Sequence, residues 1–329
     1  TSYTSNLGTP ALRREVCRYV RDNYHVSYRP EDECIITIGV SEALDIAMRA
    51  LLDPGDEVLY TEPCFVSYPA EVRMAHGIPV PIETKVEDAF ALDPAVLRRK
   101  ITPRTKVLLL NFPCNPTGAV MPLESLKEVA AIAMEHDLVV ITDEIYSELL
   151  YEGEHVSIAS LPGMRDRTLF LHGFSKAFAM TGWRVGYACG PREIIDAMMK
   201  VHQYAIMCAS TMAQEAALEA LRNGEKEMLR MRESYCERRN LMVDGLNRIG
   251  LNCLLPKGAF YTFPSVKSTG LSSTEFAEQL LKAEKVAVVP GVAFGACGEG
   301  FVRCCYATSA SDLIEAIDRM GRFVQSLKH

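Results

Sequence analysis

Short apolar segments alternate with amphipathic segments along the first two thirds of the chain. The apolar segments are too short for helices and rich in branched side chains, so they predict strands at Cys34–Ile38, Val58–Thr61, Lys106–Asn111, Leu138–Thr142, Thr168–His172 and Val185–Cys189. Helices are predicted at Pro10–Tyr24 (with Thr9 as the N-cap), Ser41–Leu52, Leu123–His136 and Pro191–Tyr204. Continuously apolar strands that alternate with helices indicate an α/β fold, in which helices cover both faces of a mostly parallel sheet.

The pattern changes near residue 225, where a long charged helix is predicted over Glu225–Ile249. Beyond it we expect strands at Leu251–Leu255, Ala259–Phe263, Val286–Val289 and Phe301–Tyr306, and helices at Ser273–Glu284 and from Ser309 onward. We therefore predict a large domain over residues 1–225 and a smaller α+β domain over residues 226–329.

Composition narrows the function classes without identifying one. Hydrophobic residues make up 48% of the chain and charged residues 23%, as in ordinary globular proteins, and no apolar run is long enough for a membrane span. The first residues lack the pattern of a signal peptide, and a net charge of −7 argues against a nucleic-acid partner. The 11 cysteines include no CxxC pair, so we expect reduced, mostly buried thiols in a cytoplasmic protein and no metal site.

Polar residues gather where the predicted strands end, which is where an open α/β sheet binds its ligands. Asn115, Asp143, Tyr146 and Lys176 each follow a strand, and Gly39-Val40-Ser41 opens a helix after the first one. Each residue taken alone has an ordinary structural interpretation: a turn at Asn115, a helix cap at Asp143, a core Tyr146 and a solvated Lys176. Their common position at strand ends favours a binding site.

Four segments resemble motifs of the class I/II aminotransferases, and the resemblance covers nearly the whole chain. Ser175–Tyr187 resembles the lysine signature of that family, and Asn115–Gly118 resembles its asparagine motif. Asp143–Tyr146 and Phe301–Tyr306 resemble its aspartate–tyrosine and arginine motifs. The resemblance implies the fold-type I transferase architecture, with a mostly parallel seven-stranded sheet. It also implies a homodimer with active sites at the subunit interface, and pyridoxal 5′-phosphate (PLP) as cofactor.

The same resemblance implies the roles of the residues around the cofactor ring. Lys176 would attach the cofactor covalently and then move the substrate proton, so its amine has to be accessible and neutral. Asp143 would face the pyridine nitrogen and keep it protonated. Asn115 and Tyr146 would hydrogen-bond the phenolic oxygen. Lys176, Asp143 and Tyr146 are thus the expected catalytic residues.

Further matches concern the phosphate and the ring face. Arg184 would pair with the phosphate, together with the N–H groups of Val40 and Ser41 at a helix start. Ser175 would add a hydroxyl, unless its side chain points away. Phe65 would stack on the ring, although a core phenylalanine is the structural alternative.

On the substrate side, Arg303 matches the arginine that binds the α-carboxylate, with Asn115 beside it. A guanidinium fork suits a planar carboxylate, and a structural salt bridge is the alternative. Tyr3 matches a tyrosine that reaches the phosphate of the neighbouring subunit. In the family this tyrosine lies some tens of residues into the chain. In the family, a segment that covers the substrate precedes this tyrosine. That segment is absent from this sequence, and we expect its absence to affect activity.

The expected function is transfer of an amino group from an L-amino acid to a 2-oxo acid such as 2-oxoglutarate. The donor would be aspartate, an aromatic amino acid or a diaminopimelate derivative. A carbon–sulfur lyase on the same scaffold remains an alternative, as does a non-catalytic PLP-binding regulator, although no basic DNA-binding domain accompanies this chain. A nicotinamide dehydrogenase is disfavoured because Gly39-Val40-Ser41-Glu42-Ala43-Leu44 lacks the GxGxxG fingerprint.

Overall fold

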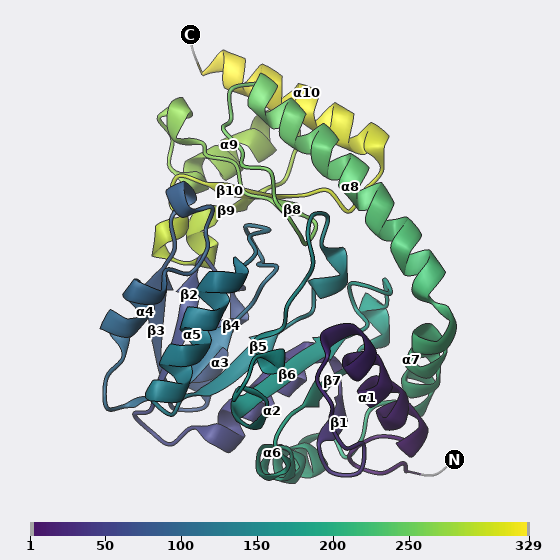
Figure 1. The fold of residues 1–329 in the computed structure, drawn as a ribbon. Helices are drawn as coiled ribbons and strands as arrows, with labels where there is room; N and C mark the ends of the chain where they lie inside the picture. The colour runs from purple at the N-terminus through teal and green to yellow at the C-terminus, as the bar shows by residue number, and fades with distance from the viewer. Residues whose placement is uncertain (1–2, 328–329) are drawn as a thin grey trace.

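The protein is described by a computed structural model over residues 3–327 and is built around a seven-stranded sheet. The strands of this sheet, in chain order, are β1 (Cys34–Thr37), β2 (Glu57–Glu62), β3 (Ile78–Glu83), β4 (Thr105–Leu110), β5 (Val139–Asp143), β6 (Thr168–Gly173) and β7 (Gly186–Cys189). Their order across the sheet is β1-β7-β6-β5-β4-β2-β3 (Figure 1). Only β7 runs antiparallel to its neighbours, β1 and β6, so the prediction of a mostly parallel seven-stranded sheet is confirmed.

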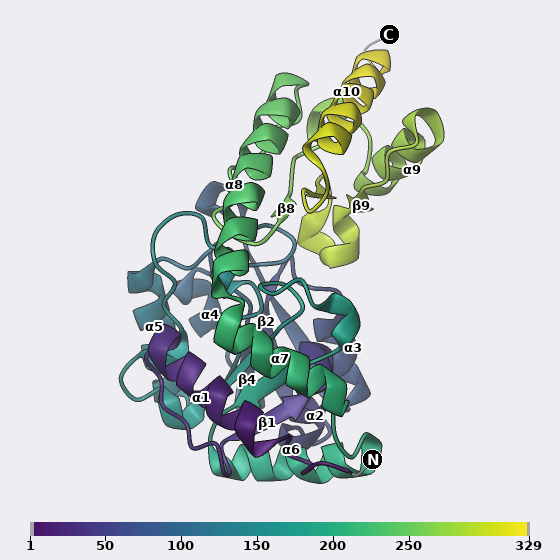
Figure 2. The ribbon, with the colours of Figure 1, turned by 90° about the vertical axis from the view of Figure 1, so that its right-hand side faces the viewer.

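Helices cover both faces of the sheet, as the alternating pattern predicts (Figures 1 and 2). The helices are α1 (Pro10–Tyr24), α2 (Gly39–Leu51), α3 (Ser67–Met74), α4 (Pro94–Lys100), α5 (Leu123–Glu135), α6 (Arg192–Ala205), α7 (Thr211–Asn223), α8 (Glu225–Arg248), α9 (Ser273–Glu284) and α10 (Ala310–Ser326). Apolar residues of α2, α3 and α6 pack on one face, and those of α1, α5 and α7 pack on the other. None of the helices over residues 3–327 is both long and apolar enough to cross a membrane.

Local sequence signals fix several helix ends where they were expected. The hydroxyl of Thr9 accepts a hydrogen bond from the Leu12 amide and Pro10 occupies the first turn, so α1 begins as predicted. At α9, Ser272 and Glu275 form a reciprocal capping box. These caps satisfy amide groups that the first helical turn leaves free.

The C-terminal part forms a second, three-stranded sheet in the order β8-β10-β9. Its strands are β8 (Tyr261–Thr262), β9 (Val289–Pro290) and β10 (Val302–Cys305). Helices α8, α9 and α10 pack around their own apolar cluster beside this sheet, and α8 runs from the end of α7 up to α10 (Figure 1). Helix α8 begins at Glu225, next to the predicted domain boundary, and the division into two domains stays a prediction.

One predicted strand, Leu251–Leu255, is wrong: this segment forms no strand in the described chain. The side chain of Asn247 hydrogen-bonds both backbone groups of Cys253. Its Oδ1 accepts from the Cys253 N–H at 2.9 Å, and its Nδ2 donates to the Cys253 carbonyl at 3.2 Å. Those groups are therefore unavailable to a neighbouring strand.

Candidate active site

The predicted functional residues line one pocket of about 340 Å³ between the two sheets. Ten of the eleven candidates line it: Val40, Ser41, Phe65, Asn115, Asp143, Tyr146, Ser175, Lys176, Arg184 and Arg303. The exception is Tyr3, whose side chain is 80% exposed and lies outside this pocket. Its expected contact with a second subunit stays a prediction.

Sheet topology explains why residues so distant in sequence meet. Asp143 ends β5 and Lys176 follows β6, and the carboxyl ends of parallel strands share one edge. Arg184 reaches the same edge from the opposite chain direction, because it precedes the antiparallel strand β7. Arg303 comes from β10 and closes the pocket from the small sheet.

Asp143 is a buried carboxyl group, 5% exposed, at the base of the pocket. Its Oδ2 accepts a hydrogen bond from the Tyr68 hydroxyl at 2.7 Å, and its Oδ1 accepts one from the Ile145 amide at 3.2 Å. Burial raises its pKa to about 6. Within residues 3–327 no lysine, arginine or histidine forms an ion pair with it. The carboxylate is therefore ready to pair with a cationic group of a ligand.

Lys176 lies half-buried in the same pocket, between aromatic rings. Its Nζ is 5.4 Å from the ring centre of Phe260 and 5.8 Å from that of Tyr146. Burial lowers the pKa of this amine, and the guanidinium of Arg303 lowers it further. A lower pKa increases the fraction of neutral, nucleophilic amine.

Arg184 and the start of α2 form a cradle for an anion. Helix α2 has no side-chain cap, so the amides of its first turn remain available, and its dipole favours negative charge there. Gly39 packs against the Arg184 side chain and has a positive φ of 73°. A Cβ added to Gly39 would lie 2.8 Å from Nη2 of Arg184. Arg184 itself is exposed and lines the pocket, with one hydrogen bond to the Thr181 carbonyl at 3.1 Å, so other donors of its guanidinium are available to a ligand.

Replacing Gly39 by Ala is expected to weaken binding of a phosphorylated ligand without unfolding the protein. The methyl group would push against the Arg184 guanidinium and strain a left-handed backbone, at a cost of about 1–2 kcal/mol. Equilibrium titration with inorganic phosphate and with PLP measures the loss. Gly55→Ala is the matched control, because Gly55 has a φ of 97° and open space around it. Equal losses for both variants would contradict a specific role for Gly39.

Arg303 is held in a fixed orientation. Its Nη1 donates to Oδ1 of Asn115 at 2.8 Å, and its guanidinium lies 4.4 Å from the ring centre of Tyr261 and 4.8 Å from that of Phe294. No carboxylate of the described chain pairs with it, so the structural salt bridge considered as an alternative is not present. Its free donors are available to an anionic ligand.

Sequence reasoning missed three pocket residues that hold the predicted ones in place. Tyr68 donates to Asp143; Asn111 donates to the Asp143 carbonyl at 2.9 Å and accepts from the Asn115 amide at 3.1 Å. The Tyr261 hydroxyl lies 3.1 Å from that of Tyr146. Asn111 had a visible signal, since it is a polar residue at a strand end, and Tyr68 lies one helical turn after Phe65.

Comparison with known proteins decides the family. The sequence profile described as "Aminotransferase class I and II" matches residues 1–320. The chain belongs to this family. The predicted family, the α/β transferase fold and the enzyme class are thereby confirmed, and amino-group transfer is the activity that its relatives support.

Relatives and solved structures agree along nearly the whole chain. The putative aminotransferase YugH of Bacillus subtilis (strain 168) is 54% identical, over 98% of this chain and 84% of its own length. An aromatic aminotransferase from Pyrococcus horikoshii OT3 superposes with a TM-score of 0.98 at 43% identity, over 100% of this chain and 89% of that one. An aspartate aminotransferase from Thermus thermophilus with maleate gives 0.94 at 46%, over 98% and 84%.

Proposed function

We propose that this aminotransferase uses PLP and moves an amino group from an L-amino acid to a 2-oxo acid such as 2-oxoglutarate. The observation that carries the proposal is the joint presence of three groups in one pocket: Asp143, the Lys176 amine and the anion cradle of Arg184 and α2. Each group suits one part of PLP, namely the pyridine nitrogen, the aldehyde and the phosphate.

The donor set fits the cofactor electrostatically. Asp143 is a buried carboxylate without a cationic partner in the described chain, and a protonated pyridine nitrogen would supply that partner. Ser41 and Val40 offer first-turn amides to the phosphate, and Ser175 lines the pocket close to Lys176. Phe65 lines the same pocket, where its ring can cover the face of the cofactor.

When bound, PLP draws electrons from the Cα atom of an amino acid and carries its amino group to the acceptor. Lys176 would hold the cofactor through its amine and later remove and return the Cα proton, a task for which its lowered pKa suits it. Asp143 would keep the pyridine nitrogen protonated. Tyr146 and Asn115 would donate hydrogen bonds to the phenolic oxygen.

Arg303 would determine which substrate bond breaks. A guanidinium fixed by Asn115 and two aromatic rings can hold the α-carboxylate in one plane, which sets the orientation of the other Cα bonds. The α-carboxylate does not react, so its binding energy can be used to orient the bond that does react. Amino acids and 2-oxo acids share this carboxylate, so one arginine serves both half-reactions.

The substrate proposal rests on relatives with 40–54% identity, which are named as aspartate, aromatic-amino-acid, aspartate/prephenate and N-acetyl-LL-diaminopimelate aminotransferases among others. We propose a donor from these classes. The expected homodimer and cytoplasmic location stay predictions.

A panel of amino donors with 2-oxoglutarate as acceptor tests the reaction type. A transaminase forms glutamate and the donor's keto acid in equal amounts, and only when the acceptor is present. A carbon–sulfur lyase would release ammonia from a sulfur amino acid without an acceptor. Binding of PLP without turnover of any donor would favour the regulator.

Replacing Arg303 by Lys is expected to weaken binding of amino acid and keto acid while PLP occupancy stays nearly unchanged. The point charge of lysine loses the two-pronged contact, at about 1.5–3 kcal/mol, or roughly 10–150-fold in Kd. Titration with a dicarboxylate inhibitor, monitored through the absorbance of the cofactor, measures the loss of affinity.

Arg184→Ala should show the opposite pattern, with weaker PLP retention and nearly normal inhibitor affinity in the loaded fraction. This pair of variants separates the two anion sites because each removes one guanidinium. If Arg303→Lys lost PLP and bound the inhibitor normally, the two arginines would have exchanged roles.

A further inference from the structure

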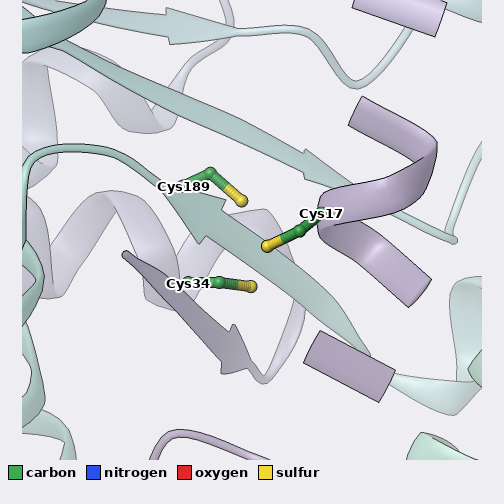
Figure 3. A group of neighbouring side chains, drawn as sticks. All are labelled: Cys17, Cys34 and Cys189. Atoms are coloured by element: carbon green, nitrogen blue, oxygen red, sulfur yellow. The ribbon is translucent and has the colours of Figure 1, made fainter. Parts of the chain in front are cut away.

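Three cysteine side chains converge at the end of the sheet that lies away from the active site. Cys17 comes from α1, Cys34 from β1 and Cys189 from β7, and their Sγ atoms all lie within 4.8 Å of one another. Figure 3 shows the three sulfur atoms pointing toward a common centre between the helix and the two strands. The sequence does not predict this cluster, because Cys34 and Cys189 are far apart along the chain. Only the antiparallel pairing of β1 with β7 brings them together.

The cluster is enclosed and chemically uniform. Cys34 and Cys189 are fully buried, Cys17 is 7% exposed, and all three are free thiols. Three sulfurs bound to one metal at about 2.3 Å would lie roughly 4 Å apart. Sulfur atoms already within 4.8 Å of each other can therefore reach a shared ion through small rotamer changes.

The three thiols titrate differently: burial raises the pKa of Cys34 and Cys189 well above the usual value, whereas the pKa of Cys17 is lowered. Hydrogen bonds from the Cys189 and Cys34 thiols lower the pKa of Cys17, and the Arg13 guanidinium lowers it further, while Glu31 acts in the opposite direction. Arg13 is only 8% exposed and donates to the carbonyls of Gly8, Pro30 and Glu31. In the described chain Arg13 pairs with no carboxylate, so its positive charge would help to stabilise a thiolate at Cys17.

We propose that Cys17, Cys34 and Cys189 form a three-coordinate site for a soft monovalent metal ion, Cu(I). Thiolates select soft ions, whereas a structural zinc site requires four ligands. Over residues 3–327, three metal-binding side chains meet here, and no histidine or carboxylate joins them. The ion replaces thiol protons, which pass to solvent, and no change of oxidation state takes place.

An entry route exists beside Cys17. This residue lines a surface hollow of about 360 Å³ together with Arg14, Arg18 and Tyr28. The Tyr28 hydroxyl is buried there without a hydrogen-bond partner in the described chain. Cys17 is the one cluster residue with exposed surface, at 7%, so an ion that enters from this hollow would reach Cys17 before Cys34 and Cys189.

The site would act on stability and leave catalysis unchanged. Cys34 and Cys189 are paired at one end of β1 and β7, whereas Thr37 and Gly186 are paired at the end that leads to the cofactor cradle. A bound ion would link α1 to both strands at the far end of the sheet. Because the ion binds the folded state, it should raise the unfolding temperature without a change in kcat.

Anaerobic titration of the PLP-loaded enzyme with Cu(I), supplied as its acetonitrile complex against a chromophoric chelator, tests the proposal. We expect one tight equivalent for the parent and a higher unfolding temperature. For Cys17→Ser we expect affinity more than roughly 100-fold weaker, since loss of an outer partner alone costs about 10–100-fold. Cys17→Ser should also lose the metal-dependent thermal shift.

Cys208→Ser is the matched control, because it removes one thiol outside the cluster and should keep both effects. Cys189→Ala provides a second cluster variant, and far-UV circular dichroism checks its folding. The proposal is overturned if Cys17→Ser binds Cu(I) as tightly as Cys208→Ser. It is equally overturned if equimolar Zn(II) displaces Cu(I) from the parent. Neither result depends on the PLP chemistry proposed above.

Discussion

Replacement of Lys176 by Ala is expected to abolish transamination, with a loss in kcat of roughly 10⁴-fold or more, the upper end of acid–base contributions. Lys176 is the one lysine among the described residues that line the active-site pocket. Burial lowers its pKa, so a neutral amine is available at the position where a Cα proton has to be moved. Steady-state kinetics with the best donor measures the effect.

The same variant also reports on cofactor attachment. Borohydride treatment of the parent should fix the cofactor on Lys176, as peptide mass spectrometry would reveal, and the Ala variant should take no label. Lys226→Ala is a suitable control because Lys226 is exposed at the start of α8, away from the pocket. A label on a different lysine, or kcat in Lys176→Ala within about tenfold of the parent, would refute the assignment.

The sequence predicts the central strands because they are continuously apolar, and it predicts the site because polar residues follow those strands. Asp143 and Lys176 are predicted from their positions at strand ends, and the parallel pairing of β5 and β6 brings them to the same edge of the sheet. Arg303 required the family resemblance, since β10 is short and pairs only with other short strands of the small sheet.

Elements that were not predicted carry weak or conflicting local signals. Strand β3 contains Pro79 and Pro81, which normally disfavour a strand, and it is tolerated because it lies at the sheet edge beside β2. Helices α3 and α4 have only 8 and 7 residues, too few for a clear periodicity. Helix α7 is an exception, because its buried residues recur at helical spacing and the sequence analysis nevertheless does not predict it.

The sequence also does not predict contacts between side chains that are far apart along the chain. The hydrogen bond from Tyr68 to Asp143 joins residues 75 positions apart, and that from Arg303 to Asn115 joins residues 188 apart. No local pattern encodes such pairs, because they depend on how strands and small sheet are placed in space. The cluster of Cys17, Cys34 and Cys189 escaped a search for short metal motifs for the same reason.

Asp143→Asn is expected to lower the rate of Cα deprotonation by roughly 10²–10³ or more, as measured in single-turnover mixing with the amino donor. Asparagine keeps the size of the side chain and an oxygen that can accept from Tyr68. It loses the charge, so the protonated ring nitrogen is no longer stabilised as negative charge develops on the substrate. Asp143→Glu keeps the charge and should be milder, although its longer side chain has to fit a site that is 5% exposed.

The structure also provides the competing explanation that this experiment has to exclude. Oδ1 of Asp143 accepts from the Ile145 amide, so the residue caps the turn after β5 whether or not it touches a cofactor. If capping were its only role, Asn would replace it well, since both residues cap equally. A deprotonation rate in Asp143→Asn within about threefold of the parent would therefore reduce Asp143 to a cap. A large loss in the deprotonation rate with unchanged thermal stability would instead show that the reaction requires the charge of Asp143.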